Sequence, residues 1–202
     1  MNRPITLSLA AIAFVISTSS AGTVAFAQGL LTQYFPIPVA LMKEAALTAI
    51  ATCAAKGDHV VASIYDSNAI ERILFVSDHT VDRHHLIELA RRKAYTALNG
   101  GQLSSQLMKT WAAPDNYPPA GDAGYMLNGP PGGLRNITLP GGAGIKINQD
   151  AIAGLGVAGA STPEQDEACA VAGVAKIQAR LNQLQSRIDP LKAQLKATLE
   201  AK

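Results

Sequence analysis

Residues 141–173 read GGAGIKINQDAIAGLGVAGASTPEQDEACAVAG, and this stretch decides the fold. Two apolar runs in it, 144–148 and 151–160, predict adjacent strands. Thr162 then fits a helix N-cap, Pro163 the first helical position and Gln165 the capping-box position. The stretch therefore predicts a strand pair that leads directly into a helix.

Residues 154–159 also spell G-x-G-x-x-G, the fingerprint of dinucleotide sites. Such a site needs a second parallel strand after the helix, with an acidic residue on it for the ribose. Here the helix continues into more helical sequence, and the acidic residues of 164–167 would repel a pyrophosphate. We therefore expect no nucleotide site. The glycines give room for a backbone or a ligand, and the acidic residues, Asp166 and Glu167 included, suit a helix N-terminus.

The remaining chain predicts a mixed α/β fold of the α+β type, with an antiparallel sheet of about five strands flanked by helices. Asp78 or Thr80 fits the N-cap of the second helix. The expected elements are a helix within 36–57, strands in 59–67 and 71–77, a helix over 81–98, a short helix over 104–112, a Pro- and Gly-rich loop over 114–133 and a strand contribution from 134–139.

A regular apolar stripe continues the last helix toward the C-terminus. Its members alternate spacings of four and three: Ile177, Leu181, Leu184, Ile188, Leu191 and Leu195. This a/d pattern predicts a helix that packs along another helix, with a kink at Pro190. We expect a domain over 28–178 and an amphipathic extension over 179–202 that either packs back or mediates homo-oligomer assembly.

The first 27 residues have the pattern of a cleaved secretory signal, with Arg3, an apolar run and Ala25-Phe26-Ala27 before the cleavage point. The run is too short for a membrane anchor. Its removal lowers the formal charge from +2 to +1, since only Arg3 is lost. We expect a periplasmic or secreted protein without nucleic-acid binding or stable membrane insertion.

Two cysteines, Cys53 and Cys169, are the whole cysteine content of the chain. In an oxidising compartment they can pair, whereas in the cytosol they would be buried thiols. Cys53 lies near the end of the first helix and Cys169 in the first turns of the last, and such helices can pack side by side. We expect a disulfide between them.

The stretch 141–173, together with the helix that ends in KAYTA (93–97), resembles the GlcG/HbpS family of haem-binding domains, which is related to the C-terminal domain of PduO-type cobalamin adenosyltransferases. The resemblance covers roughly residues 40 to 178. It implies a mixed α/β domain with an antiparallel sheet, often assembled into oligomers. It also implies haem or another tetrapyrrole as ligand, held by an exported carrier or sensor accessory.

Under this resemblance His79 is the leading iron ligand, because the family often has H-T where His79-Thr80 stand. A loop or helix-start histidine is the competing interpretation. His59 fits a surface residue, and adjacent helical His84 and His85 cannot face one metal together. Further candidates for haem contact are Thr80 and Tyr95, Arg92 and Lys93 for the propionates, and Gly156 as part of a wall. A solvated helix face paired with Glu88 is the alternative for the cations, Arg91 included.

The chain shows no G-x-S-x-G or H-E-x-x-H motif and no paired catalytic carboxylates in a recognisable context. Reversible haem binding is therefore the favoured function, without a catalytic residue. A small-molecule enzyme or accessory protein of unknown substrate, or an oligomeric scaffold, stays open as the alternative.

Overall fold

The structure, a computed structural model, describes residues 37–111 and 136–200. Its centre is an antiparallel sheet of four strands in the order β2-β1-β4-β3. These strands are β1 (Val61–Asp66), β2 (Glu71–Val76), β3 (Gly142–Ile147) and β4 (Asp150–Ala158). Val61 lies opposite both Val76 and Ala158, so the start of β1 and the ends of β2 and β4 meet at one end of the sheet.

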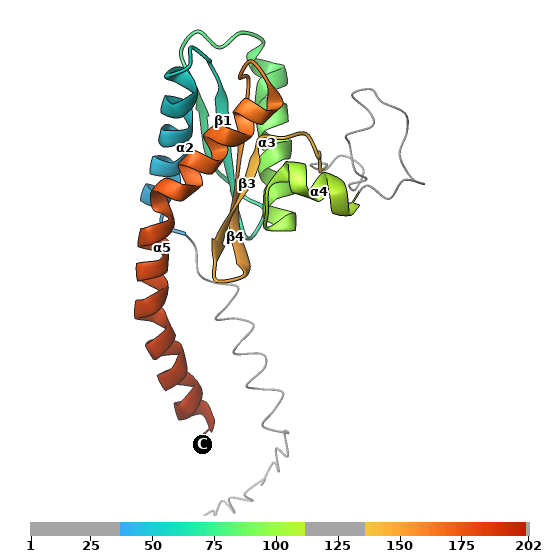
Figure 1. The fold of residues 1–202 in the computed structure, drawn as a ribbon. Coiled ribbons are helices and arrows are strands. Elements are labelled where there is room, and N and C mark those ends of the chain that lie inside the picture. Colours follow the sequence, from blue (N-terminus) through green and yellow to red (C-terminus); the bar gives the residue numbers. More distant parts are fainter. Residues whose placement is uncertain (1–36, 112–135, 201–202) are drawn as a thin grey trace, which may run out of the picture.

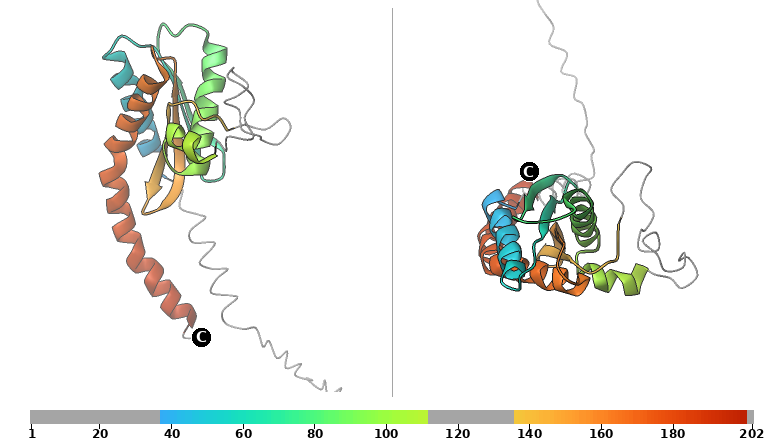
Figure 2. Two further views of the ribbon diagram at one scale, coloured as in Figure 1. Left: turned by 45° about the vertical axis from the view of Figure 1, so that its right-hand side comes forward. Right: turned by 90° about the horizontal axis from the view of Figure 1, so that it is seen from above.

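Helices cover both faces of the sheet (Figures 1 and 2). On one face, α2 (Val39–Ala54) and the first part of α5 (Pro163–Glu200) pack against each other and enclose the larger apolar core. On the other face, α3 (Arg83–Gly100) packs across β4, β1 and β3, with α4 (Ser104–Trp111) beside it. The domain is thus a three-layer arrangement in which α3 alone covers most of its face.

Glycines on β4 allow α3 to lie directly on the strand. Gly154 and Gly156 share one face because strand side chains alternate. A Cβ on Gly156 would lie 2.1 Å from the carbonyl oxygen of Ala90, and one on Gly154 would lie 2.1 Å from that of Ala94. The glycine fingerprint therefore makes room for the backbone of a helix, not for a nucleotide.

The fold class agrees with the expectation from the sequence, but the strand number does not. Four strands form the sheet instead of about five. In the segment 134–139, which was expected to contribute a strand, Ile137 makes an isolated bridge within the described part. The expected signal sequence, 1–27, and the whole Pro- and Gly-rich loop, 114–133, lie outside the described residues.

The two helix starts differ in how well they were predicted. At α5 the expectation is confirmed, since the Gln165 backbone N–H donates to Thr162 Oγ1 at 3.2 Å. At α3 it is wrong: the N-cap is Asp82, which makes no side-chain cap hydrogen bond. The Thr80 hydroxyl instead donates to the Ser77 carbonyl at 2.7 Å and so closes the preceding turn.

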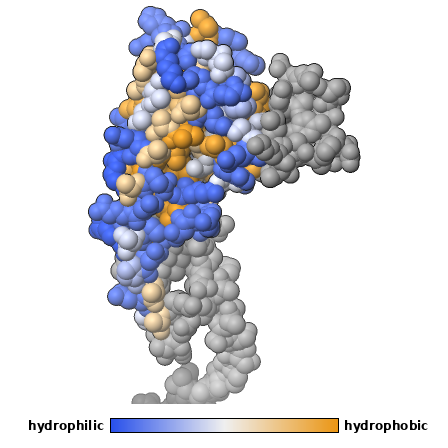
Figure 3. Space-filling model, in the orientation of Figure 1, coloured by the Kyte–Doolittle hydropathy of each residue, from blue (hydrophilic) through white to orange (hydrophobic). Residues whose placement is uncertain are grey.

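The last helix leaves the body of the domain (Figure 1). Ile177 and Leu181 are fully buried, and Leu184 packs against the same core. α5 then continues through Pro190 to Glu200. On the face seen in Figure 3 this lower part is mainly hydrophilic. Within 37–111 and 136–200, no helix has the length and apolar character needed to span a membrane.

Candidate functional site

His79 lies in the turn between β2 and α3, and its side chain is exposed. Its backbone has φ 62, a left-handed conformation that is uncommon outside glycine. The turn is held by the Thr80 hydroxyl, which is bound to Ser77, and by Arg83 Nε, which donates to the Thr80 carbonyl at 3.1 Å. The imidazole is therefore presented to solvent from a fixed backbone.

His59 is the immediate ring neighbour of His79. The two ring centroids are 5.5 Å apart and the ring planes are inclined by 67°. His59 is exposed, as expected, but it is not isolated from the predicted site. The hairpin explains the pairing, because Val61 and Val76 are partners and residues just outside the pair come together as well.

Two exposed apolar residues lie close to His79 in the sequence, Val76 before it and Val81 after it. Val76 is 38% exposed and Val81 is 79% exposed. An exposed imidazole between exposed valines suits a ligand that is mainly apolar and carries a metal.

Two of the proposed cations on α3 are engaged by carboxylates. Arg91 binds Glu71 through two hydrogen bonds of 2.9 and 2.8 Å, and Arg92 forms an ion pair with Glu88 at 3.7 Å. Glu88 also pairs with Arg91 at 3.6 Å. Both arginines therefore pair with Glu88, as the alternative interpretation expected, and contact of Arg92 with a propionate stays a prediction.

Tyr95, another predicted contact residue, stacks edge-on against Tyr65 with ring centroids 6.2 Å apart. Tyr65 is 5% exposed. Burial, reinforced by the charge of Glu71, raises the pKa of Tyr65 to about 12. This aromatic pair lies along the α3 face, near the Arg91–Glu71 contact.

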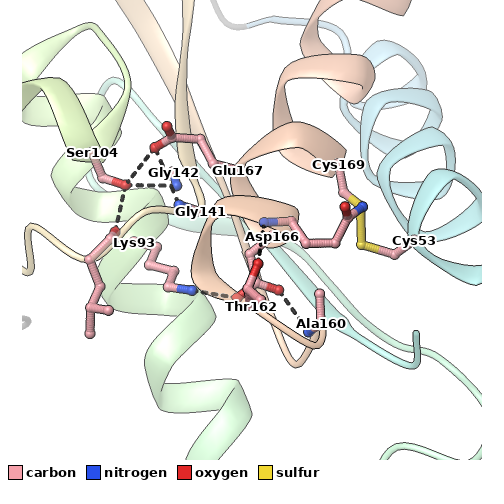
Figure 4. A network of polar contacts seen from close by, with 12 residues as sticks. Cys53, Lys93, Ser104, Gly141, Gly142, Ala160, Thr162, Asp166, Glu167 and Cys169 are labelled. Atoms are coloured by element: carbon pink, nitrogen blue, oxygen red, sulfur yellow. Dashed lines mark hydrogen bonds and ion pairs between the residues drawn. A yellow bond between two sulfur atoms is a disulfide. The ribbon is translucent and has the colours of Figure 1, made fainter. Parts of the chain in front are cut away.

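Lys93 does not lie where a haem propionate could reach it. Its amine donates to Asp166 Oδ2 at 2.7 Å, and the two side chains are 1% and 5% exposed (Figure 4). Burial lowers the pKa of Lys93 and raises that of Asp166, while the attraction between the two charges opposes both shifts. The prediction that Lys93 contacts a ligand is wrong, because the helix turns this position into the domain interior.

The acidic residues of α5 have partners that local reasoning missed. Asp166 Oδ1 accepts the Ala160 N–H at 2.8 Å, in addition to its ion pair with Lys93. The Glu167 carboxylate accepts the Ser105 N–H at 3.2 Å and the Ser105 hydroxyl at 2.5 Å. It also accepts the Gly141 N–H at 3.3 Å (Figure 4). Both carboxylates therefore join elements, beyond their favourable place at a helix N-terminus.

The motif residues of this chain consequently serve the fold. Lys93 belongs to the KAYTA segment and Asp166 to the segment 141–173, so the ion pair joins the two stretches that carry the family resemblance. Gly142 belongs to the same arrangement, because a Cβ there would lie 2.4 Å from the Lys93 carbonyl oxygen. The spacing within each motif hinted at a shared role, but only the tertiary structure supplies the partners.

Gly156 is likewise a packing residue in this structure. It is buried, and the α3 backbone fills the space over it. A ligand wall at Gly156 would require α3 to move away, so the prediction of ligand contact there is wrong for this arrangement.

The predicted disulfide is confirmed. Cys53 of α2 and Cys169 of α5 are bonded, with Cα atoms 5.7 Å apart and a sequence separation of 116. The bond ties the two helices that cover one face of the sheet (Figure 4). It stabilises the layer opposite α3 and takes no part in the histidine turn.

A groove in the described part of the chain lies away from the predicted haem contacts. An open groove of about 820 Å³ runs along the outer side of α2 and is bordered by Lys43, Lys56 and Lys176. It contains none of the predicted haem-contact residues. Among the described residues, no group of three or more His, Cys, Asp or Glu side chains is arranged to hold a metal ion.

Solved structures with the same fold include HbpS itself. A crystal structure of HbpS matches with a TM-score of 0.59 and 29% sequence identity, covering 74% of this chain and 95% of that one. A double mutant of HbpS from Streptomyces reticuli matches with a TM-score of 0.58 and 26% identity, covering 74% and 92%.

A third structure, titled as a PduOC:heme complex, matches with a TM-score of 0.55 and 23% identity, covering 70% and 94%, and supports the fold alone. No curated protein matches this sequence significantly.

A family profile described as "Haem degrading protein HbpS-like" matches residues 37–175. The match covers more than half of the chain, and it includes the ion pair, the strand glycines and the His79 turn. The chain therefore belongs to the HbpS-like family.

Proposed function

We propose that this chain is an exported protein that binds haem or a related tetrapyrrole reversibly and acts as a carrier or a sensor accessory. The carrying observation is the exposed His79 on a fixed, left-handed backbone between two exposed valines. Membership in the HbpS-like family and the likeness to a structure titled as a haem complex support the choice of ligand.

The residues around the turn fit haem in donor type. Imidazole is a common axial ligand of haem iron, and Val76 and Val81 offer apolar contact to the macrocycle. Bound haem would supply a coordinating iron atom within a flat apolar ring. Thr80 would act indirectly, since its buried hydroxyl holds the turn that presents His79.

Arg92 and Tyr95 remain proposed contacts on α3, whereas Lys93 and Gly156 are left out for the reasons above. Arg92 would meet a propionate only by sharing or exchanging its contact with Glu88. Export by the N-terminal signal and assembly into a homo-oligomer are further parts of the proposal, supported by the sequence patterns of 1–27 and 177–195.

Titration with haemin, followed by the Soret and charge-transfer bands, tests the proposal. We expect a saturable spectral change with the wild-type protein and a shifted or absent change with His79→Ala. His84→Ala is the matched control, because His84 is also exposed but lies on α3. An unchanged His79→Ala spectrum would remove the ligand assignment, and a wild-type protein without any spectral change would remove haem binding.

The carrier role has its own test, the transfer of haem to apomyoglobin. Rapid and complete transfer from the loaded protein supports a carrier. Retention of haem under the same conditions contradicts that role, while leaving haem binding itself intact.

Haem degradation is a second candidate function, favoured by membership in a family described as haem-degrading. Haem-loaded protein can be treated with hydrogen peroxide as oxidant, with Soret loss and chelatable iron recorded together. Faster loss than for haem bound to serum albumin supports degradation, and equal rates contradict it.

A further inference from the structure

We propose that His59 and His79 together bind a divalent late first-row transition metal ion such as Ni²⁺, Cu²⁺ or Zn²⁺. The proposal rests on two exposed imidazoles whose ring centroids are 5.5 Å apart. Neutral imidazole is a favoured ligand of these ions. The site needs no haem, so it stands apart from the proposed function.

The separation of the rings suits a shared ion. A metal–nitrogen bond is about 2.0–2.1 Å and the ring centre lies about 1.1 Å further out, so two imidazoles on a tetrahedral ion have centroids roughly 5.2 Å apart. The observed 5.5 Å is close to this value. The present inclination of 67° is edge-to-face, and turning the exposed rings about their side-chain bonds would direct one nitrogen of each toward a common point.

Hydrogen bonds between the two chain segments fix the spacing of the histidines. The Val60 N–H donates to Ser77 Oγ at 2.8 Å, and the Ser77 N–H donates to the Val60 carbonyl at 2.9 Å. His59 directly precedes Val60 and is held by this clamp. On the other side, the Thr80 hydroxyl binds the Ser77 carbonyl at 2.7 Å and holds the residue after His79.

The left-handed backbone of His79 adds to this picture. A non-glycine residue at φ 62 persists when its surroundings hold it there, and such residues gather at ligand sites. The strain has no evident use in packing, because the side chain it directs is exposed. Its effect is to place the imidazole beside His59.

The site is open. Asp58, next to His59, already accepts hydrogen bonds from the Ser161 N–H and hydroxyl at 3.0 and 2.5 Å. In the described ranges, no third His, Cys, Asp or Glu side chain completes a metal-ligating group. Water or an added ligand would therefore fill the other coordination positions, and binding is weaker than at a four-ligand structural site.

Calorimetric titration of the tag-free, haem-free chain with Ni²⁺, and separately with Zn²⁺, tests the proposal. We expect one ion per chain in the wild type. His59→Ala and His79→Ala should each weaken binding about tenfold or more, with little further loss in the double variant, since either change removes the chelate. His84→Ala and His85→Ala are matched controls with other exposed histidines and should bind like the wild type.

The proposal is overturned by a wild type that binds no ion, by a loss confined to one of the two variants, or by equal losses in the α3 controls. Thermal melting without metal shows whether each variant is folded. Because both histidines are exposed, the His59→Ala and His79→Ala variants should melt at the same temperature as the wild type. Haemin spectra of the same variants distinguish this proposal from the proposed function. A protein that fails to bind haem can still bind Ni²⁺, and a protein that fails to bind Ni²⁺ can still bind haem.

Discussion

The Lys93–Asp166 ion pair and the His59–His79 pair lie at the same end of the sheet, yet they are built in opposite ways. The ion pair is buried, and each of its charges depends on the other for compensation. The histidines are exposed and make only a ring contact, while the backbone beneath them is hydrogen-bonded. A domain can therefore leave exposed side chains such as these histidines replaceable when the polar contacts that hold the fold lie one layer deeper.

The largest effect should come from breaking the buried pair. Asp166→Ala leaves the Lys93 charge without a partner, and such changes cost about 3–5 kcal/mol of unfolding free energy. Lys93→Met combined with Asp166→Leu should recover much of this loss, because no buried charge is left. Urea unfolding measures both. If Asp166→Ala is as stable as the wild type, the buried ion pair is no more important for stability than the exposed histidine pair, and the contrast between them is wrong.

Loss of the disulfide should rank next. The chain-entropy description gives about 4–5 kcal/mol for a loop of this length, and measured losses are typically about 2–4 kcal/mol. The change is Cys53→Ala with Cys169→Ala, and thermal or urea unfolding reports it. Haemin and Ni²⁺ binding should be retained at temperatures where the variant is folded, since the bond joins α2 to α5 and not the histidine turn. Two free thiols in denatured, unreduced wild type would contradict the bond.

Gly156→Ala tests the close approach of α3. The new Cβ would meet the Ala90 carbonyl oxygen at 2.1 Å, so the helix must shift, and overpacking of this kind costs about 1–3 kcal/mol or somewhat more. Ala69→Gly is a control in the opposite direction: this exposed residue has φ 58, which glycine adopts freely. A fully stable Gly156→Ala protein would show that α3 lies further from β4.

Tyr65 provides a smaller, pH-dependent effect. Its pKa is raised to about 12 in the folded protein, above the ordinary value of 10.0, so the folded state favours the neutral phenol. The corresponding stability is present below pH 10 and is lost as the pH rises toward 12. Tyrosinate absorbance should show one late-ionising residue that is missing in Tyr65→Phe. If the wild type and Tyr65→Phe give the same alkaline titration curve per tyrosine, the raised pKa of Tyr65 is contradicted.

The smallest change in stability should follow deletion of residues 190–202. The described side chains of this part, such as Ala193 and Gln194, are exposed, so the unfolding free energy should change by less than about 0.5 kcal/mol. A deletion after Gln178 also removes the buried Leu181 and should destabilise the domain. If the extension mediates assembly, light scattering shows a lower mass for the shorter deletion, and an unchanged mass contradicts that role.

Local sequence signals predicted much of the fold and little of the site. The start of α5 was predictable because Thr162 and Pro163 act within one helical turn. The partner of Asp166 was not, because a carboxylate in a first turn is already explained by the helix dipole, which gives no reason to search further. When a local interaction already explains a residue, its partner in the tertiary structure is easily overlooked.

The histidine pair could have been found by one more step. With Val61 opposite Val76 in a hairpin, His59 falls opposite Asp78, beside His79. The expected strand ranges, 59–67 and 71–77, define the pairing register only approximately. A register shift of one residue turns a strand's side chains to the other face of the sheet. Contacts between loop residues beyond the strand ends depend on the exact register, so a sequence pattern predicts them poorly.

Glu167 joins three elements of the domain through a single side chain. Its one carboxylate holds both the start of α4, through Ser105, and the turn before β3, through Gly141. The start of α4 and the turn before β3 are thus held together by one side chain of α5. Loss of the Glu167 carboxylate would therefore release two elements that lie far apart in the sequence at the same time.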